Sequence, residues 1–354
     1  MARNLKNLKK TIHLVYPFNL KKKINPWSIG NNIWYSISDK FNIKNYNWTS
    51  LKKIEPNEGD ILIGHAHTNP FTVFRRSLKN IKWSKKILIQ PYNEDPLQMS
   101  HLYNVIPECD HFLAICGKFW FNRIKKSKFK SWQKKMIQLD LGIDTKQYPF
   151  IKYQFGKKFK RKYIYIGNDY SYNNFAKNIN YLKKIVNNLK KNSFSSAGNK
   201  QISQEKHYGW LDFTDKGVLK IIKDYDFLIQ VSKNDANPSI VLEAMSWGLI
   251  PLITKGCGYR ELNKKLSIHQ NNYVEAIKKI NFFQKKDEKY LKKIQRENLD
   301  LLKKKFNWKN FQIKIRSVIL KKNNKRKKST VSYTQKEINF FIKNTKASPN
   351  YYLN

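Results

Sequence analysis

The chain has 354 residues, more than one hydrophobic core usually supports, which favours two domains of about 150 residues each. It carries 70 lysines and arginines against 25 aspartates and glutamates, a net charge of +45, so nucleic acid and anionic membranes are candidate partners. The excess is almost all lysine and accompanies frequent Asn, Ile, Tyr and Phe, residues with AT-rich codons, so genomic base bias is an alternative explanation. With 40% hydrophobic residues the chain is not a disordered tail.

The cysteine spacing and the lengths of the apolar runs indicate the cellular compartment in which the protein is expected. Cys109, Cys116 and Cys257 have neither paired spacing nor a zinc-ligand pattern, which fits a reduced compartment. The apolar stretch Thr11–Phe18 is too short for a secretory signal, and no run reaches the roughly 18 apolar residues of a spanning helix. We expect a cytoplasmic protein, with peripheral association at the inner membrane face as a further possibility.

The first 150 residues alternate short apolar runs with helical spacing. Strands are expected at Ile12–Val15, Asp60–Gly64, Lys86–Gln90, His111–Ile115 and near Ile137, and helices at Asn31–Lys40 and Pro70–Leu78. Such alternation predicts a doubly wound α/β domain. The basic connector that follows Phe150 sets the expected boundary of an N-terminal Rossmann-like domain at residues 1–150.

A second α/β series fills residues 151–305. Strands are expected at Tyr163–Gly167, Phe227–Val231 and Ile250–Thr254, and helices at Asn174–Leu189, Val218–Lys223, Ser239–Trp247 and Lys286–Lys305, with a break at "SSAGNK". Residues 306–354 are expected to form an amphipathic stretch at Asn310–Leu320, a basic run at Lys321–Lys328 and a weak helical patch at Ile338–Ile342. We expect this tail to be peripheral or mobile.

One segment carries a chemical pattern. From Asp226 the text reads "DFLIQVSKNDANPSIVLEAMSWGLIPLITKGCGYREL", a buried strand, a polar loop and a helix. Asn237 is expected to cap a helix whose first residue is Pro238, and such a terminus suits a phosphate or diphosphate. The loop places the carboxylate of Asp235 beside that terminus, and Glu243 on the helix can accept hydrogen bonds from ligand hydroxyls.

Asp235 and Glu243, with seven residues between them and followed by Gly248, Pro251 and Glu261, resemble the donor-site signature of retaining GT-B glycosyltransferases of the family 4 (group 1) type. That family includes sucrose synthases and many lipopolysaccharide and phosphatidylinositol glycosyltransferases. Its usual pattern is Glu, seven residues, Glu, and here Asp235 stands first. The resemblance implies two Rossmann-like domains that face each other across a cleft. It also implies that Asp235 contacts the transferred sugar and Glu243 the ribose of the nucleotide.

Weaker fragments extend the resemblance over roughly residues 12–320. The donor-binding residues that it implies, besides Glu243, are Asn237, Pro238, Ser239, Gly167, Gly209, Lys233 and Lys200. Lys233 and Lys200 would help to neutralise the diphosphate, with plain solvated lysines as the alternative. The family usually has Arg after the glycine of "YIG", where this chain has Asn168, and a nearby lysine, whereas Lys177 here lies within an expected helix.

Four residues of the N-terminal half are acceptor-side candidates. His65 and His67 in "GHAHTNP" follow a strand at the end where ligands bind in open α/β sheets, and we expect His67 to take part in catalysis. Metal binding and a structural role are alternatives for this pair. Gly30 in "INPWSIGNN" resembles the family's glycine-rich acceptor loop, although it can also be a turn glycine. Tyr92 stands where the family often has histidine.

The sequence therefore predicts a glycosyltransferase that moves a sugar from a nucleotide sugar to a glycan or lipid-linked acceptor with retention of configuration. No Asp-x-Asp pattern occurs, and no metal or other cofactor is expected. One alternative is a catalytically inactive sugar-binding protein, which Asn168 and Tyr92 would fit. The other is a basic nucleic-acid-binding protein, which the charge would fit but which leaves the block from Asp235 to Glu261 unexplained.

Overall fold

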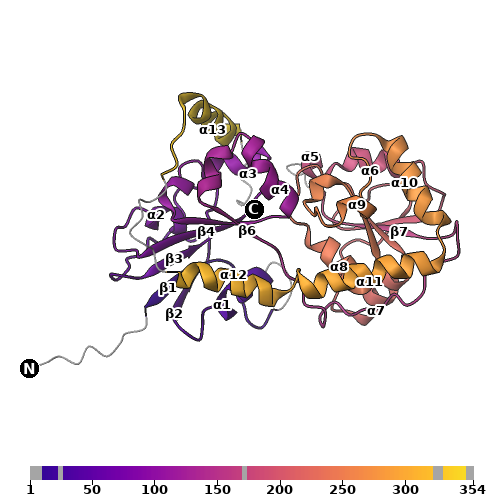
Figure 1. Cartoon of the computed structure of the whole chain (residues 1–354), viewed down its shortest axis with the longest axis horizontal. Helices are drawn as coiled ribbons and strands as arrows, with labels where there is room; N and C mark the ends of the chain where they lie inside the picture. The colour runs from indigo at the N-terminus through magenta and orange to yellow at the C-terminus, as the bar shows by residue number, and fades with distance from the viewer. Residues whose placement is uncertain (1–9, 23–26, 170–173, 322–329, 348–354) are drawn as a thin grey trace, which may run out of the picture. The chain divides into compact units, whose positions relative to one another are not determined.

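The computed structural model describes residues 10–22, 27–169, 174–321 and 330–347 (Figure 1). The chain divides into two compact units. Unit 1 comprises Met1–Ile115, Arg123–Leu139 and Lys309–Asn354, and unit 2 comprises Cys116–Asn122 and Asp140–Trp308. The C-terminal helices, which the sequence pattern set apart as a third segment, thus group with unit 1.

Unit 1 is built on a parallel six-stranded sheet of order β2-β1-β3-β4-β5-β6. Its strands are β1 (Thr11–Val15), β2 (Asn42–Tyr46), β3 (Ile61–Gly64), β4 (Lys85–Pro91), β5 (His111–Ile115) and β6 (Met136–Leu139). The central strands have buried apolar centres, Ile61–Ile63 in β3 and Ile87–Ile89 in β4, as expected for a parallel sheet covered on both faces.

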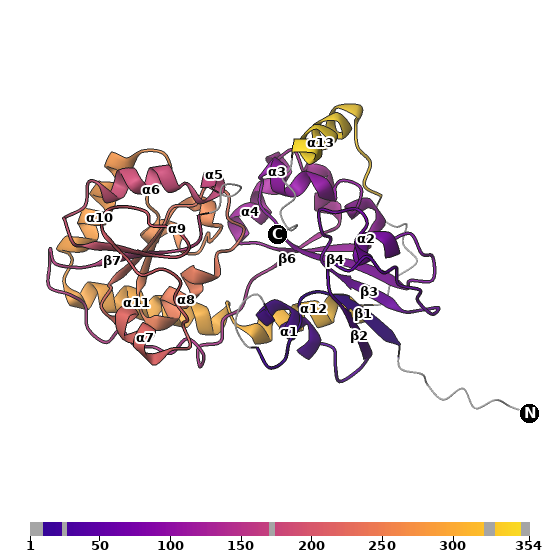
Figure 2. The same cartoon turned by 180° about the vertical axis from the view of Figure 1, so that it is seen from behind.

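Helices cover the two faces of this sheet, with α1 and α12 on one side and α3 and α13 on the other (Figures 1 and 2). The α-helices of unit 1 are α1 (Trp27–Tyr35), α2 (Val73–Ser77), α3 (Pro96–Met99), α12 (Trp308–Leu320) and α13 (Gln335–Ala347), and α4 (Lys118–Arg123) begins in unit 2. Short 3₁₀ helices are η1 (Ser100–Leu102), η2 (Ile106–Glu108), η3 (Ile124–Lys126) and η4 (Lys130–Lys134).

Unit 2 contains a parallel five-stranded sheet of order β11-β10-β7-β8-β9. Its strands are β7 (Tyr163–Ile166), β8 (Phe194–Ala197), β9 (Lys206–His207), β10 (Phe227–Gln230) and β11 (Ile250–Ile253). Strand order reverses between β7 and β10, which makes the carboxyl ends of these two strands the topological switch point of the unit.

The helices of unit 2 also form two layers, with α6, α9 and α10 on one side of the sheet and α7, α8 and α11 on the other (Figures 1 and 2). Their bounds are α5 (Asn174–Lys177), α6 (Ile179–Val186), α7 (Lys216–Lys223), α8 (Ser239–Trp247), α9 (Asn263–Leu266), α10 (Tyr273–Lys285) and α11 (Glu288–Lys304), with the 3₁₀ helix η5 (Lys255–Cys257). Helix α8 is buried from Ile240 to Trp247 and forms the centre of the unit.

The predicted α/β fold with two Rossmann-like parallel sheets is confirmed, while several elements were not predicted, among them β2, β8 and α10. Strand β2 was missed because it is a polar, half-exposed edge. Strand β8 was interpreted as a break, since its serines are weak strand formers, yet all four of its residues are buried. Helix α10 begins at a capping residue, Asn272, whose side chain accepts a hydrogen bond from the Glu275 backbone amide at 3.2 Å.

The C-terminal tail differs from the expectation that it is peripheral or mobile. Instead of a peripheral patch at residues 338–342, helix α13 packs on unit 1 through Phe341, which is fully buried. The phenyl ring of Phe341 stacks on Trp132, and the indole nitrogen of Trp132 donates a hydrogen bond to the Tyr333 hydroxyl at 2.8 Å. Of the predicted basic run 321–328, residues 322–328 lie outside the described residues.

Within residues 10–22, 27–169, 174–321 and 330–347, no helix is both long and apolar enough to span a membrane.

Candidate functional site

The switch point of unit 2 gathers most of the predicted donor-binding residues. Gly167 directly follows β7, and the loop from Ser232 to Pro238 follows β10, so both lie at the edge of the sheet where ligands bind in open α/β folds. The loop leads straight into α8. Strand, loop and helix N-terminus therefore meet at one place.

The start of α8 differs from the prediction by one residue. Pro238 is the N-cap, Ser239 is the first helical residue, and no side chain caps the helix. Asn237, expected as the cap, lies one position earlier, and 8% of it is exposed. Neither amide atom of the Asn237 side chain has a hydrogen-bond partner among the described residues. A buried amide without partners at an uncapped helix N-terminus is suited to hold an anionic or hydroxyl-bearing ligand.

Glu243 lies one turn farther along α8 and is 5% exposed. Burial raises the pKa of its carboxyl group to about 7, against which a hydrogen bond from the Ser239 hydroxyl acts. The pKa of Tyr148 is raised as well, mainly by burial and secondly by the nearby carboxyl group of Glu243. Glu243 is thus a desolvated carboxyl group whose charged form would gain from additional hydrogen-bond donors.

Asp235 is fixed by several contacts within unit 2. Its side chain forms an ion pair with the ammonium group of Lys177 on α5. Its backbone amide donates to the Gly256 carbonyl at 2.9 Å, and its own carbonyl accepts from the Trp120 indole at 2.7 Å. Burial acts to lower the pKa of Lys177, but the attraction of Asp235 and Tyr165 outweighs it, so this pKa is raised and the lysine stays charged.

Lys177 was not among the predicted donor-binding residues, because its position within an expected helix spoke against a ligand role. Helix α5 ends at Lys177, where the chain is close to the β10 loop: the Lys233 amide donates to the Ala176 carbonyl at 2.7 Å. The signal that could have found this lysine is the absence of another cation soon after Asn168.

The two other predicted lysines are placed differently. The Lys233 ammonium group lies 4.8 Å from the centre of the Phe175 ring, a cation–π contact at the edge of the switch point. Lys200 is exposed on the loop after β8. The structure therefore brings Lys233, but not the exposed Lys200, into a side-chain contact at the switch point.

Close backbone packing requires glycine at Gly198, whereas at Gly209 a Cβ atom would meet no atom within 4 Å and only the positive φ favours glycine. A Cβ atom on Gly198 (φ +141°) would lie 2.1 Å from the Gly167 carbonyl oxygen, so these backbones touch at the ends of β7 and β8. The carbonyl of Gly209 (φ +67°) accepts a hydrogen bond from the Gly198 amide at 2.8 Å. Both predicted glycines, Gly167 and Gly209, thus join the loops at the carboxyl end of the sheet.

The Gly-Cys-Gly loop packs on the same region. A Cβ atom on Gly256 would lie 2.2 Å from the Lys233 carbonyl oxygen, which only glycine permits. Glu261, at the end of this loop, forms an ion pair with Lys305, whose ammonium group also lies 3.5 Å from Asp140. The block from Asp235 to Glu261 is therefore one packed body rather than a set of free loops.

In unit 1 the predicted acceptor-side histidines lie at its own switch point, between β1 and β3. His65 follows β3 and is 5% exposed, with its ring 4.5 Å from that of Trp48. Burial lowers the pKa of His65 well below its usual value, with further effects of His101 and His67. His67 is also buried and accepts a hydrogen bond from the Asn69 amide at 3.0 Å, and burial lowers its pKa too. Both rings are therefore neutral at physiological pH.

Gly30 and Tyr92 have structural explanations. Gly30 lies inside helix α1 rather than in a loop, and a Cβ atom there would lie 1.8 Å from the Pro17 carbonyl oxygen, so α1 packs directly on the chain after β1. Tyr92 is completely buried, with its ring edge-to-face against Phe112 and Phe129. Gly30 thus lets α1 approach the chain after β1, and Tyr92 fills the core beside β5.

Among the described residues, no group of three or more His, Cys, Asp or Glu side chains is arranged to hold a metal ion. His65 and His67 thus have no third ligand within the described part of the chain.

Comparisons with known proteins give structural neighbours only, since neither a protein-family model nor a curated protein matches the chain. A glycosyltransferase from Rickettsia africae ESF-5 is 13% identical and has a TM-score of 0.58, with 89% of this chain and 100% of that chain covered. WaaG, a glycosyltransferase involved in lipopolysaccharide biosynthesis, is 10% identical and has a TM-score of 0.57, with 88% and 99% covered.

Sucrose-phosphate synthase from Thermosynechococcus elongatus is 9% identical and has a TM-score of 0.59, with 88% of this chain and 98% of that chain covered. All three neighbours match nearly the whole of both chains, so the similarity extends over the two parallel sheets and their helices. The chain therefore has the fold of the GT-B glycosyltransferases.

Proposed function

We propose that the protein is a glycosyltransferase that takes its sugar from a nucleoside diphosphate sugar bound to unit 2. The observation that supports this most strongly is a pair of desolvated polar side chains, the amide of Asn237 just before α8 and the carboxyl group of Glu243 on it. Asn237 has no hydrogen-bond partner among the described residues, and Glu243 is a buried carboxyl group with a raised pKa. Such groups cost stability, which a bound ligand with hydroxyl and phosphate groups would offset.

The charges suggest how the donor is oriented. The diphosphate is proposed to lie at the uncapped N-terminus of α8, where the helix dipole favours negative charge. Glu243 then accepts hydrogen bonds from the ribose hydroxyls, and Asp235 contacts the sugar. Lys177 sits beside Asp235 and supplies a cation near the leaving group, in place of the arginine that Asn168 replaces.

In the proposed reaction the bond between the anomeric carbon and the phosphate oxygen breaks, and the electron pair leaves with the nucleoside diphosphate. The acceptor hydroxyl forms the new bond to that carbon and loses its proton. Stabilising the departing diphosphate charge in a water-poor site is the main requirement, which Lys177 and the start of α8 can meet. We propose that no metal takes part and that the configuration is retained.

The acceptor is proposed to be a glycan or a lipid-linked glycan that contacts unit 1 at its switch point. His67 is the proposed general base, because burial lowers its pKa and keeps the imidazole neutral and able to accept a proton. His65 would contribute to acceptor binding. The structural neighbours include WaaG, which is involved in lipopolysaccharide biosynthesis.

A second candidate is a sugar-nucleotide-binding protein without transferase activity, which Asn168 and the buried Tyr92 favour. The first experiment is a melting-temperature screen with UDP, GDP, ADP and CMP sugars, followed by hydrolysis and transfer assays with any donor that binds. Binding together with turnover supports the transferase, and binding without turnover supports the second candidate. If no donor in the panel raises the melting temperature, the proposal fails.

A further inference from the structure

Two helices of unit 2 meet at a single left-handed residue, Asn178. Its backbone angles are φ 61° and ψ 39°, in the left-handed region that glycine prefers and that asparagine enters more readily than most residues. Helix α5 ends at Lys177 and α6 begins at Ile179. The Asn178 amide donates to the Phe175 carbonyl at 3.2 Å, and the Asn178 carbonyl accepts from the Leu182 amide at 3.1 Å. Asn178 therefore ends one helix and starts the next.

This break differs from the single helix expected at Asn174–Leu189. A residue in the left-handed conformation cannot continue a right-handed helix, so the chain changes direction at Asn178. In one continuous helix, the direction of the Lys177 side chain would be set by the axis of that helix. Because α5 is separate from α6, the direction of Lys177 is set instead by how α5 is held against the loop after β10.

Two anchors hold the end of α5 against the loop after β10. The side-chain nitrogen of Asn178 donates a hydrogen bond to the Val231 carbonyl, just after β10, at 3.2 Å. The Ala176 carbonyl accepts a hydrogen bond from the Lys233 amide of the same loop at 2.7 Å. Asn178 is 6% exposed, so its bond is shielded from water. Lys177 lies between these two anchors in the sequence.

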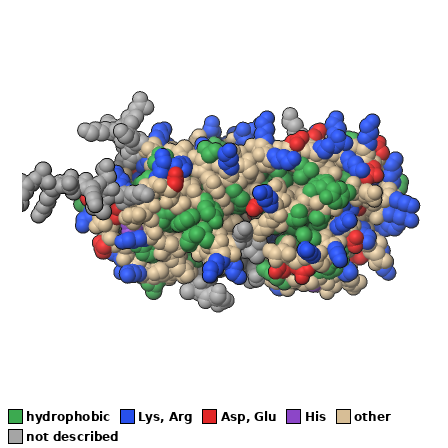
Figure 3. Space-filling view, turned by 90° about the horizontal axis from the view of Figure 1, so that it is seen from below, with side chains coloured by type: hydrophobic (Ala, Val, Ile, Leu, Met, Phe, Trp, Pro, Cys, Tyr) green, Lys and Arg blue, Asp and Glu red, His purple; other side chains and the backbone are tan. Residues whose placement is uncertain are grey.

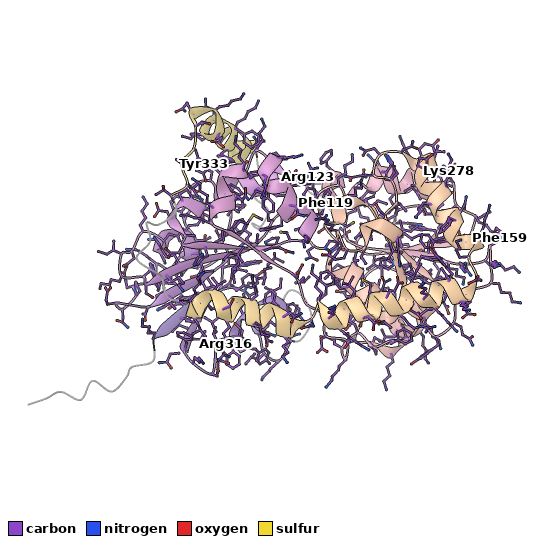
Figure 4. All side chains as sticks on the ribbon, viewed as in Figure 1. Phe119, Arg123, Phe159, Lys278, Arg316 and Tyr333 are labelled. Carbon is purple, nitrogen blue, oxygen red and sulfur yellow. The ribbon has the colours of Figure 1, made fainter. Side chains whose placement is uncertain are left out.

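The position of Lys177, rather than its charge, sets it apart from other lysines. Lysine and arginine side chains are scattered over the face of the molecule seen in Figure 3. Lys278 on α10, labelled in Figure 4, pairs at 2.8 Å with Glu275, three residues earlier, and its side chain is 69% exposed. Lys177 pairs with Asp235, 58 residues away, and its side chain is 23% exposed. This long-range pair requires that α5 and the loop after β10 are held together.

We propose that Asn178 is a positioning residue for Lys177, whose ammonium group its left-handed backbone directs toward Asp235 and the leaving diphosphate. This inference rests on the proposed function, in which Lys177 neutralises the departing diphosphate. A cation is most effective in that task when it is held in place before the reaction, because no energy is then spent on orienting it. Asn178 touches neither donor nor acceptor and acts through Lys177.

Two substitutions of Asn178 that differ in backbone freedom test this role by calorimetry with the nucleotide sugar. Asn178→Ala disfavours the left-handed conformation and should weaken binding by about tenfold, the loss expected for Lys177→Met. Asn178→Gly adopts that conformation without steric cost and should bind within about threefold of the wild type. Equal losses in the two variants would overturn the proposal. A tenfold loss in Asn178→Gly would do so even if Asn178→Ala does not fold.

Asn192 provides a matched control in the same unit. It is also an asparagine with a left-handed backbone, φ 62°, but it is exposed and precedes β8, at the amino end of the sheet rather than at the switch point. Asn192→Ala therefore carries a similar backbone strain and should bind the nucleotide sugar as tightly as the wild type. If it binds as weakly as Asn178→Ala, the loss comes from general strain and the proposal is wrong.

A double variant tests whether Asn178 acts through Lys177. If it does, the effects of the two substitutions on affinity cannot add. Lys177→Met combined with Asn178→Ala should bind the nucleotide sugar no more weakly than Lys177→Met alone. Lys177→Met combined with Asn192→Ala serves as the control and should also match Lys177→Met. Additive losses in the first double variant would show that Asn178 acts on the donor by another route.

A measurement without ligand separates this inference from the proposed function. Lys177→Met and Asp235→Asn form a double-mutant cycle whose coupling free energy, from denaturant unfolding, reports the ion pair alone. The coupling should persist in the Asn178→Gly and Asn192→Ala backgrounds and vanish in Asn178→Ala. Coupling that persists unchanged in Asn178→Ala would overturn the proposal. If no nucleotide sugar binds the wild type, the proposed function fails, and this cycle still decides whether Asn178 positions Lys177.

Discussion

Glu243 is buried on α8 with a pKa of about 7, so its ionised form costs the folded protein stability. The folded-state pKa lies above the unfolded value, so stability is lost as pH rises from 4.5 to about 7. Without ligand, Glu243→Gln should therefore raise the free energy of unfolding at pH 8 by up to roughly 3 kcal/mol and leave it unchanged at pH 4. Denaturant unfolding at both pH values measures this difference. A variant less stable than the wild type at pH 8 would contradict the assigned environment.

Lys177 and Asp235 form an ion pair at the switch point. Lys177 is proposed to neutralise the diphosphate, and Asp235 is proposed to contact the sugar. Lys177→Met should weaken nucleotide-sugar binding by about tenfold or more, because a charge-assisted hydrogen bond to phosphate is worth about 1.5–3 kcal/mol. Lys184→Met, an exposed lysine on α6, is the matched control and should bind normally. Calorimetry measures the nucleotide-sugar affinity of both variants. If Lys177→Met binds as tightly as Lys184→Met, Lys177 is not part of the donor site.

Asp235→Ala should lower turnover much more than it lowers the affinity for a sugar-free nucleoside diphosphate, because its proposed partner is the sugar. Steady-state kinetics and calorimetry on the same variant separate the two effects. If the variant loses affinity for the sugar-free nucleotide as strongly as it loses turnover, Asp235 interacts with the nucleotide and the proposed sugar contact is wrong.

At the level of elements, strand β10 depends on a buried ion pair at its start. Asp226 is 2.9 Å from the Lys152 ammonium group and also accepts from the Gly156 and Lys162 amides at 2.8 and 2.9 Å. Asp226→Ala leaves a buried ammonium group unpaired and should lower the free energy of unfolding by about 3–5 kcal/mol. Glu297→Ala, which breaks an exposed pair with Lys265, should have a much smaller effect in the same denaturant titration. Equal effects would show that the Asp226 pair is dispensable.

Helices and strands could be predicted from the sequence where the hydrophobic pattern and the local start and stop signals match the observed burial. Helix α8 ends at the predicted residue, Trp247, because Gly248 (φ +92°) follows it, and it begins at Ser239, one residue after the Pro238 expected as its first residue. Strand β8 was missed because its buried serines owe their place to neighbouring strands rather than to their own propensity. The packing of α13 depends on a long-range contact between Phe341 and Trp132, which no local pattern encodes.

The candidate site was predictable in part for the same reason. Asp235 and Glu243 lie close together in the sequence, on one loop and the helix that follows it, so their proximity could be predicted locally. The structure places both near the start of α8. The pairing of Lys177 with Asp235 joins residues 58 positions apart and required the three-dimensional structure. The off-by-one cap at Pro238 reflects proline's fixed backbone, which begins the helix without a side-chain hydrogen bond.

At the scale of the whole molecule, the net charge of +45 makes a prediction about salt. The protein should adsorb to anionic vesicles and to DNA without sequence preference at low ionic strength, and both should disappear by about 0.5 M salt, where the Debye length is only a few ångströms. Co-sedimentation with vesicles or DNA over a salt series measures this adsorption. Adsorption that persists at high salt would indicate a specific contact instead of a diffuse charge.

The central claim is that unit 2 binds a nucleoside diphosphate sugar through Glu243. Isothermal titration calorimetry at pH 8, where Glu243 is ionised, tests it with the donor that gives the largest melting shift. The account predicts measurable binding to the wild type, a loss of about tenfold or more in Glu243→Gln, and no change in the control Glu297→Gln on α11. Equal affinity of the wild type and Glu243→Gln, or the absence of binding by every donor in the panel, would contradict it.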